Sequence, residues 1–77
     1  MSNSIDLNST IEDLNPERIL DFKLRYGKPY FLIKWTGLNH EESTWEELTT
    51  LEKHAQMVQN YLNTRGYSLE GDNVRIL

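Results

Sequence analysis

The stretch YFLIKWTG at residues 30–37 is followed by HEESTWE at residues 40–46, so that Trp35 and Trp45 lie ten residues apart. The first stretch is rich in aromatic and β-branched residues, and it predicts a strand over Tyr30–Trp35. Because both indoles then fall in one small sheet, one of them can belong to the core while the other forms a recognition surface. The division between these two roles decides what the domain can bind.

Each tryptophan has a predicted place in this sheet. After a loop around Gly37, Ser43–Glu46 predicts a third, short strand next to a helix. A large ring would fill the gap between sheet and helix there, so we assign Trp45 to the structural core. Trp35 ends the second strand and is a candidate recognition ring. The alternative for Trp35 is packing inside the domain or against another domain, where aromatic residues are common.

The remaining elements follow from patterns on either side of this stretch. Glu17–Leu24 predicts a first strand, and Gly27 in the turn after it is free to take a positive φ. A helix should begin near Thr49, because Thr49 and Glu52 have the spacing of a capping box. It should end before Gly66, which suits the position just after a helix. The apolar stripe of this helix consists of Leu51, Ala55, Val58 and Leu62.

Three strands followed by one amphipathic helix predict an α+β fold. The helix must lie across one face or end of the sheet, because neither element buries its apolar side alone. A chain of 77 residues allows one domain. We expect a flexible lead at residues 1–13, a folded domain at residues 14–65 and a tail at residues 66–77.

The charge balance favours a basic partner. The chain has 12 acidic and 8 basic residues and a net charge of −4, whereas a protein that binds nucleic acid on its own usually carries a basic face. An acidic domain suits a peptide rich in lysine and arginine. Part of the basic charge nevertheless forms a local strip that could contact DNA weakly, or that could protect a solvated hairpin edge. This basic strip consists of Arg18, Lys23, Arg25 and Lys28.

Several kinds of chemistry lack the residues that they need. The sequence has no cysteine, and His40 and His54 alone are too few for a metal site. It has no glycine-rich phosphate loop and no nucleophile elbow, so we expect neither a cofactor nor catalysis from this domain. No apolar run approaches the ~20 residues that span a bilayer, and the first residues lack a signal-peptide pattern. We therefore expect a cytosolic or nuclear protein without a membrane partner.

Three motifs together resemble the chromodomain family in order and spacing. They are PERILD at residues 16–21, GKPYFLIKWTG at residues 27–37 and ESTWE at residues 42–46. The resemblance covers about residues 14–63, and it implies a curved three-stranded antiparallel sheet with a C-terminal helix packed across one end. It identifies the folded domain as a chromodomain. It also implies a nuclear, chromatin-associated role, in which many members bind methylated lysine on histone H3 tails.

The resemblance assigns residues to the family's methyllysine cage, which usually has three aromatic rings that attract the cation. Trp35 occupies one cage position, whereas Leu14 and Leu38 occupy the other two. Leucine offers apolar contact without a ring quadrupole, so we expect methylated H3 peptides to bind weakly or not at all. Glu42 falls at the rim of the cage, where a carboxylate would attract a cation; the alternative is a solvated acidic face.

The resemblance also predicts where a peptide would run. In relatives with a cage, the peptide adds a strand between two segments that correspond here to Ile11–Asn15 and Leu48–Glu52. Thr50 and Glu52 fall at the family's peptide-contacting positions. The alternative is that these two side chains only cap the helix.

Leu38, the polar loop after it and the second tryptophan motif resemble one subgroup, the second chromodomain of chromodomain–helicase–DNA-binding (CHD) remodelling ATPases. This resemblance implies a packing and regulatory module. Its partners would be a neighbouring chromodomain or ATPase domain of the same chain, together with a histone tail or nucleosome. One alternative is a stand-alone reader of methylated histone H3 that uses Trp35 and the acidic rim. The other is a weak nucleic-acid-binding module.

Overall fold

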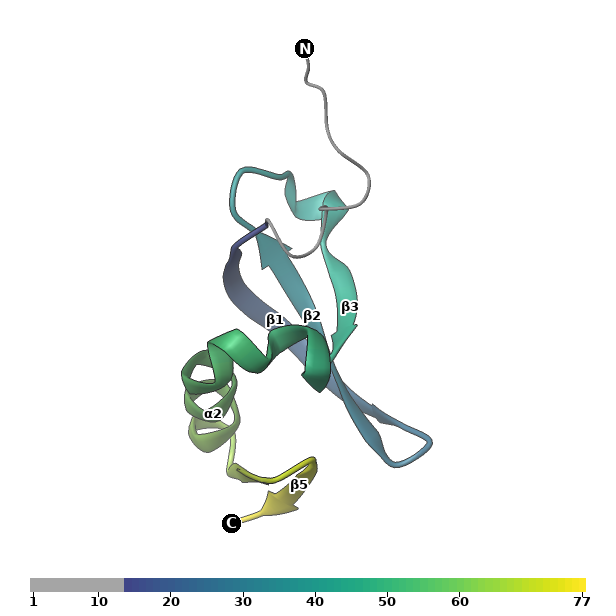
Figure 1. Ribbon diagram of the computed structural model, residues 1–77, viewed down its shortest axis with the longest axis vertical. Helices are drawn as coiled ribbons and strands as arrows, with labels where there is room; N and C mark the ends of the chain where they lie inside the picture. The colour runs from purple at the N-terminus through teal and green to yellow at the C-terminus, as the bar shows by residue number, and fades with distance from the viewer. Residues whose placement is uncertain (1–13) are drawn as a thin grey trace.

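The computed structural model describes residues 14–77, so the lead expected at residues 1–13 lies outside the described residues. The described chain forms an antiparallel sheet in the order β1–β2–β3, then helical segments, then a second sheet of β4 and β5 (Figure 1). The predicted α+β fold, a three-stranded antiparallel sheet followed by a helix, is confirmed. The strands are β1 Pro16–Arg25, β2 Lys28–Trp35, β3 Thr44–Glu47, β4 Tyr67–Glu70 and β5 Asn73–Ile76. The helical segments are the 3₁₀ turns η2 His40–Glu42 and η3 Leu48–His54, and the α-helix α2 Ala55–Thr64.

A tight turn of Tyr26 and Gly27 joins β1 to β2. Both residues have positive φ, 53° for Tyr26 and 78° for Gly27, as in the type I′ turns that suit the twist of a hairpin. Glycine adopts this conformation without steric cost, as predicted, whereas the side chain of Tyr26 disfavours it. The turn pairs Arg25 with Lys28 and so sets the register of the hairpin.

The core lies on one face of the sheet. Alternate residues of β2 are buried, because successive side chains of a strand point to opposite faces. The segment η3 and the helix α2 follow β3 and pack against this sheet (Figure 1). Trp35 belongs to the core and is only 2% exposed. The buried core residues are Ile19, Phe31, Ile33, Trp35, Leu51, Val58 and Leu62.

The register between β2 and β3 turns Trp45 away from this core. Trp45 pairs with Leu32, which lies between buried neighbours on β2. Because cross-strand partners point to the same face, Trp45 and Leu32 share the outer face of the sheet. Trp45 is 37% exposed, and Lys23 Nζ lies 4.2 Å from the centroid of its ring. The prediction that Trp45 is the core tryptophan is therefore wrong, and the buried indole is that of Trp35.

The helix begins later than the capping-box pattern predicted. The α-helix α2 starts at Ala55, and the preceding η3 has a kink at Leu51 with φ −104° and ψ 15°. Neither segment starts with a side-chain cap hydrogen bond, so the capping box predicted for Thr49 and Glu52 is wrong. In a 3₁₀ turn, side chains three residues apart lie on the same side. Here Leu48 and Leu51 both pack into the core, and their burial accounts for the 3₁₀ segment.

The chain beyond α2 is folded as a hairpin. Gly66 has φ 87°, which confirms the predicted glycine after the helix. The strands β4 and β5 then pair around a turn in which Gly71 has φ 60°. The segment expected as a tail, residues 66–77, is thus structured up to Ile76. The strand β4 lies against α2, and β5 contacts β2 (Figure 1).

Candidate functional site

A groove of about 390 Å³ lies between the ends of the three-stranded sheet and η3. Residues 49–54 of η3 form one side, and the sheet side consists of Leu14, Pro16, Trp35 and Glu46. Apolar surface and carboxylates therefore meet in one place. Such a mixture suits an extended peptide that carries a cationic side chain.

Backbone hydrogen bonding shapes the sheet side of the groove. The Thr36 N–H donates to the Asn15 carbonyl oxygen at 2.8 Å, and Pro16 pairs with Trp35 at the end of the ladder. Pro16 is buried, and its ring restricts the chain to an extended direction at this point. The segment before β1 therefore runs beside the end of β2, and Leu14 and Trp35 line the same groove.

Hydrogen bonds from β3 orient the Trp35 ring. The indole Nε1–H donates to Thr44 Oγ1 at 2.8 Å, and the Thr44 hydroxyl donates to Glu46 Oε2 at 2.7 Å. Thr44 and Glu46 flank Trp45 along the strand and point to the opposite face, towards the core side. Sequence reasoning missed both residues. The available signal was strand alternation, which places Thr44 and Glu46 together on whichever face Trp45 does not use.

Four of the predicted binding residues line the groove, namely Leu14, Trp35, Thr50 and Glu52. Thr50 and Glu52 are exposed on η3. Leu38 does not line the groove, because it packs half-buried against the core. Its N–H donates to the Trp35 carbonyl oxygen at 3.1 Å, which places it in the turn after β2. The binding roles of these residues stay predictions.

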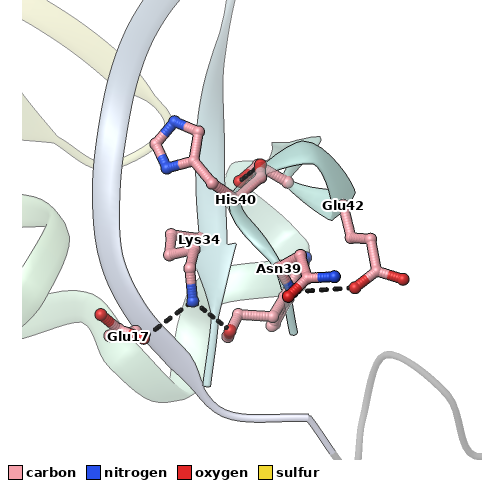
Figure 2. Close-up of polar contacts among 7 residues, drawn as sticks. Glu17, Lys34, Asn39, His40 and Glu42 are labelled. Atoms are coloured by element: carbon pink, nitrogen blue, oxygen red, sulfur yellow. Dashed lines mark hydrogen bonds and ion pairs between the residues drawn. The ribbon is translucent and has the colours of Figure 1, made fainter. Parts of the chain in front are cut away.

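Glu42, the predicted rim residue, also lies outside the groove lining. Its carboxylate accepts the Asn39 N–H at 2.8 Å, and its own N–H donates to the Asn39 carbonyl oxygen at 2.9 Å (Figure 2). This reciprocal pair closes the η2 turn. The Glu42 carboxylate therefore stabilises the loop between β2 and β3.

An ion pair ties β1 to β2 close to the groove. Lys34 Nζ lies 2.9 Å from Glu17 Oε1 and donates to the Trp35 carbonyl oxygen at 3.0 Å (Figure 2). The hydrogen bond from Lys34, followed by the charge of Lys34, lowers the pKa of Glu17 below its ordinary value. The pair holds the strand ends that carry Pro16 and Trp35.

Two other sets of predicted residues lie elsewhere. Lys23 of the basic strip contacts Trp45 on the outer face, and Arg25 Cζ lies 5.7 Å from the ring of Tyr26 at the hairpin tip. Contact of this strip with DNA stays a prediction. His54 lines the groove, and within residues 14–77 no group of three or more His, Cys, Asp or Glu residues could hold a metal ion. None of the helices within residues 14–77 combines the length and the apolar character that a membrane span requires.

A three-stranded antiparallel sheet, a helix after it and a groove beside the tryptophan that ends β2 are the features expected of a chromodomain. The Chromo (CHRromatin Organisation MOdifier) domain family matches residues 14–64, and the chain belongs to this family. It is 31% identical over 58 residues, 75% of its length, to histone-lysine N-methyltransferase SUV39H2 of Gallus gallus. It is 32% identical over 54 residues, 70% of its length, to chromo domain-containing protein rhino of Drosophila melanogaster.

These matches cover 14% and 13% of the two relatives, so the chain spans only a small part of their length. The chromodomain is a non-catalytic binding module of chromatin proteins. Assignment to the CHD subgroup stays a prediction, because neither relative is a remodelling ATPase by name.

Proposed function

We propose that this chromodomain is a nuclear module that binds a histone H3 tail at a methylated lysine, in the groove beside Trp35. One observation carries the proposal. Leu14, Trp35, Thr50 and Glu52, which the family resemblance assigns to the lysine cage and the peptide, all line a single groove. These residues come from three separate segments of the sequence, so their meeting depends on the fold.

The charge of the groove supports a basic ligand. The chain has a net charge of −4, and Glu46 and Glu52 bring two carboxylates to the lining. A histone tail is rich in lysine and arginine, and complementary charge speeds the encounter and fixes the register of the complex. Lys53 lines the same groove, so the groove carries charges of both signs.

The backbone around the groove supports an extended ligand. The segment before β1 and the η3 segment form opposite sides, with Leu14 on one and Thr50 on the other. An extended peptide between them would gain main-chain hydrogen bonds as an added strand, and the side-chain pockets would determine sequence specificity.

The composition of the groove predicts weak binding. Each aromatic wall of a cage contributes about 0.5–2 kcal/mol to holding a quaternary ammonium. Leu14 places no ring in the groove, and Leu38 lies outside its lining, so two aromatic walls of a full cage are missing, together about 1–4 kcal/mol, or roughly 5- to 1,000-fold in Kd. Trp35 is also only 2% exposed, so its neighbours must move before a cation can reach its face. Weak single-site affinity suits a module that acts beside other binding sites in a longer chain.

The names of the relatives support the same class of ligand. Two of the similar proteins are named histone-lysine N-methyltransferases, one from Gallus gallus and one from Danio rerio. Those enzymes act on the residue type that we propose this chromodomain binds. Leu38 and the loop after it resemble the CHD subgroup, but none of the similar proteins named here carries a remodelling-ATPase name.

A gain of binding tests the proposal most sharply. The wild-type domain and Leu14→Tyr are titrated by NMR with H3 tail peptides, each unmodified or trimethylated at one lysine. The new ring at the groove should tighten methyl-dependent binding about threefold to thirtyfold. Leu24→Tyr is the matched control, because Leu24 is an exposed leucine of β1 that does not line the groove. Absence of methyl-dependent shifts at the groove in both wild type and Leu14→Tyr would overturn the proposal.

A further inference from the structure

Among residues 14–77, Trp35 provides the aromatic wall of the groove, and a carboxylate stands beside it. Two successive hydrogen bonds, of 2.8 and 2.7 Å, link the Trp35 indole nitrogen through Thr44 to Glu46 Oε2. Glu46 is half-buried and lines the same groove as Trp35 and Leu14. A lysine head group bound in this groove can therefore meet both the Trp35 ring and this carboxylate.

The Glu46 carboxylate can accept a further hydrogen bond. A carboxylate has two oxygens and about four acceptor positions, and the Thr44 hydroxyl uses one of them. Because Thr44 also accepts from Trp35, the threonine holds the carboxylate in a fixed place relative to the ring. The acceptor is thus positioned before any ligand arrives.

The three methylation states of lysine differ in what they offer to such an acceptor. Each state carries the same positive charge. Monomethyl- and dimethyllysine keep at least one N–H, whereas trimethyllysine has none. A hydrogen bond between an ammonium N–H and a carboxylate is roughly twice as strong as one between neutral groups. Full aromatic cages offset the missing hydrogen bond with ring contacts, but here Leu14 stands at one of those ring positions.

We propose that Glu46 makes this groove selective for monomethyl- or dimethyllysine over trimethyllysine. The inference rests on the proposed function and names the ligand of the same groove more closely. Lower methylation leaves an N–H for Glu46, while the methyl groups already present contact Leu14 and Trp35. Unmodified lysine is disfavoured, because its compact ammonium is strongly hydrated and loses the most hydration free energy on entering a partly apolar groove.

The experiment compares dissociation constants on one protein. For each H3 tail lysine tested, peptides in the unmodified, mono-, di- and trimethylated states are titrated into the wild-type domain by NMR. The informative quantity is the ratio of the trimethyl to the dimethyl dissociation constant. Loss of folded protein changes both constants equally, so this ratio reports selectivity alone. In the wild type we expect dimethyllysine to bind roughly fivefold tighter than trimethyllysine.

Substitution of Glu46 should remove the preference. In Glu46→Gln the charge is lost and the shape is kept, so the ratio should fall close to one. Glu47→Gln is the matched control, because Glu47 is the next residue of β3 and its side chain lies on the outer face. It pairs there with Tyr30 and accepts a hydrogen bond from the Tyr30 hydroxyl at 3.3 Å. The control should keep the wild-type ratio. If Glu46→Gln does not fold, Glu46→Asp is used instead. Its side chain is shorter by one methylene, so the carboxylate lies farther from the ligand and the ratio should also fall towards one.

The outcomes separate this inference from the function on which it rests. Wild-type binding that is equal or tighter for trimethyllysine overturns the selectivity and leaves the reader function standing. A wild-type ratio that survives in the folded Glu46 variant overturns the role of Glu46. Absence of methyl-dependent binding in every state overturns both proposals.

Discussion

The ring of Tyr67 meets the ring of Phe22 edge-on, with their centroids 5.5 Å apart. Phe22 in turn stacks on Phe31, a fully buried residue of β2, again with centroids 5.5 Å apart. A line of three rings therefore runs from the buried face of the sheet to the hairpin of β4 and β5. The Leu69 N–H adds a hydrogen bond of 3.0 Å to Gln59 Oε1 on α2. The hairpin lies beyond residue 64, where the family match ends, and these contacts attach it to the rest of the domain.

Tyr67→Ala should destabilise the whole domain and not only the hairpin. The half-buried ring contributes apolar burial and an aromatic contact, together about 1–3 kcal/mol. Urea unfolding followed by circular dichroism measures the loss. The control is Tyr26→Ala, because Tyr26 is 92% exposed and its substitution should change the free energy of unfolding by less than about 0.5 kcal/mol. Equal effects of the two substitutions would contradict an anchoring role for Tyr67.

The two tryptophans should differ in their contribution to stability. Trp35→Ala removes a fully buried ring and should lower the free energy of unfolding by about 3–5 kcal/mol. Trp45→Ala removes a partly exposed ring on the outer face and its contact with Lys23, which should reduce stability by about 1 kcal/mol. Thermal and urea unfolding of both variants give the comparison. A larger loss of unfolding free energy for Trp45→Ala than for Trp35→Ala would show that Trp45 is the core tryptophan.

Thr44→Val tests the hydrogen bond that orients the buried indole. Valine keeps the shape of threonine but leaves the Trp35 Nε1–H without its acceptor, which should destabilise the domain by about 1–3 kcal/mol. The Trp35 indole N–H resonance should shift as well. Thr44→Ser keeps the hydroxyl, so that both the resonance and most of the stability should return. An unchanged indole resonance in Thr44→Val would show that the bond does not form in solution.

The Glu17–Lys34 pair should make a pH-dependent contribution to stability. Pairing with Lys34 lowers the pKa of Glu17, so its stabilisation is complete above the ordinary carboxyl pKa and disappears as the pH falls through the lowered value. Glu17→Gln should therefore lower the melting temperature slightly at neutral pH and not at all in strong acid. Because Glu17 is exposed, salt should reduce the difference. In a Lys34→Met background, the pH-dependent effect of Glu17→Gln should be much smaller, because only the weaker attraction of Arg18 then lowers the pKa of Glu17. An undiminished effect would show that Lys34 is not its main cause.

Local patterns were sufficient to predict the three-stranded sheet. The β2 strand is apolar and aromatic, and Gly27 marks the turn before it. The positions of β1 and β2 and their order along the chain therefore followed from the sequence. The helix start was missed because the spacing of Thr49 and Glu52 satisfies a local rule, whereas the burial of Leu51 against the sheet favours a 3₁₀ turn. The hairpin of β4 and β5 was missed because each strand has only four residues, although Gly71 marks its turn.

The functional site could be predicted only in part. The family resemblance supplied Leu14 and Trp35, which the groove brings together. The faces of Trp45 and Glu46 could not be derived, because a shift of one residue in strand register exchanges the two faces of a strand. That register depends on pairing with β2 across a loop. The pairing of Leu32 with Trp45 settles it and leaves Glu46 on the groove side.

The two indoles lie on opposite faces of one small sheet, and this arrangement has a spectroscopic consequence. The Trp35 indole is enclosed and hydrogen-bonded, whereas the Trp45 indole meets solvent and an ammonium group. Their fluorescence should therefore differ in wavelength and in accessibility to aqueous quenchers. A ligand in the groove would alter the emission of Trp35 and leave that of Trp45 as an internal reference, so the domain contains its own optical probe of occupancy.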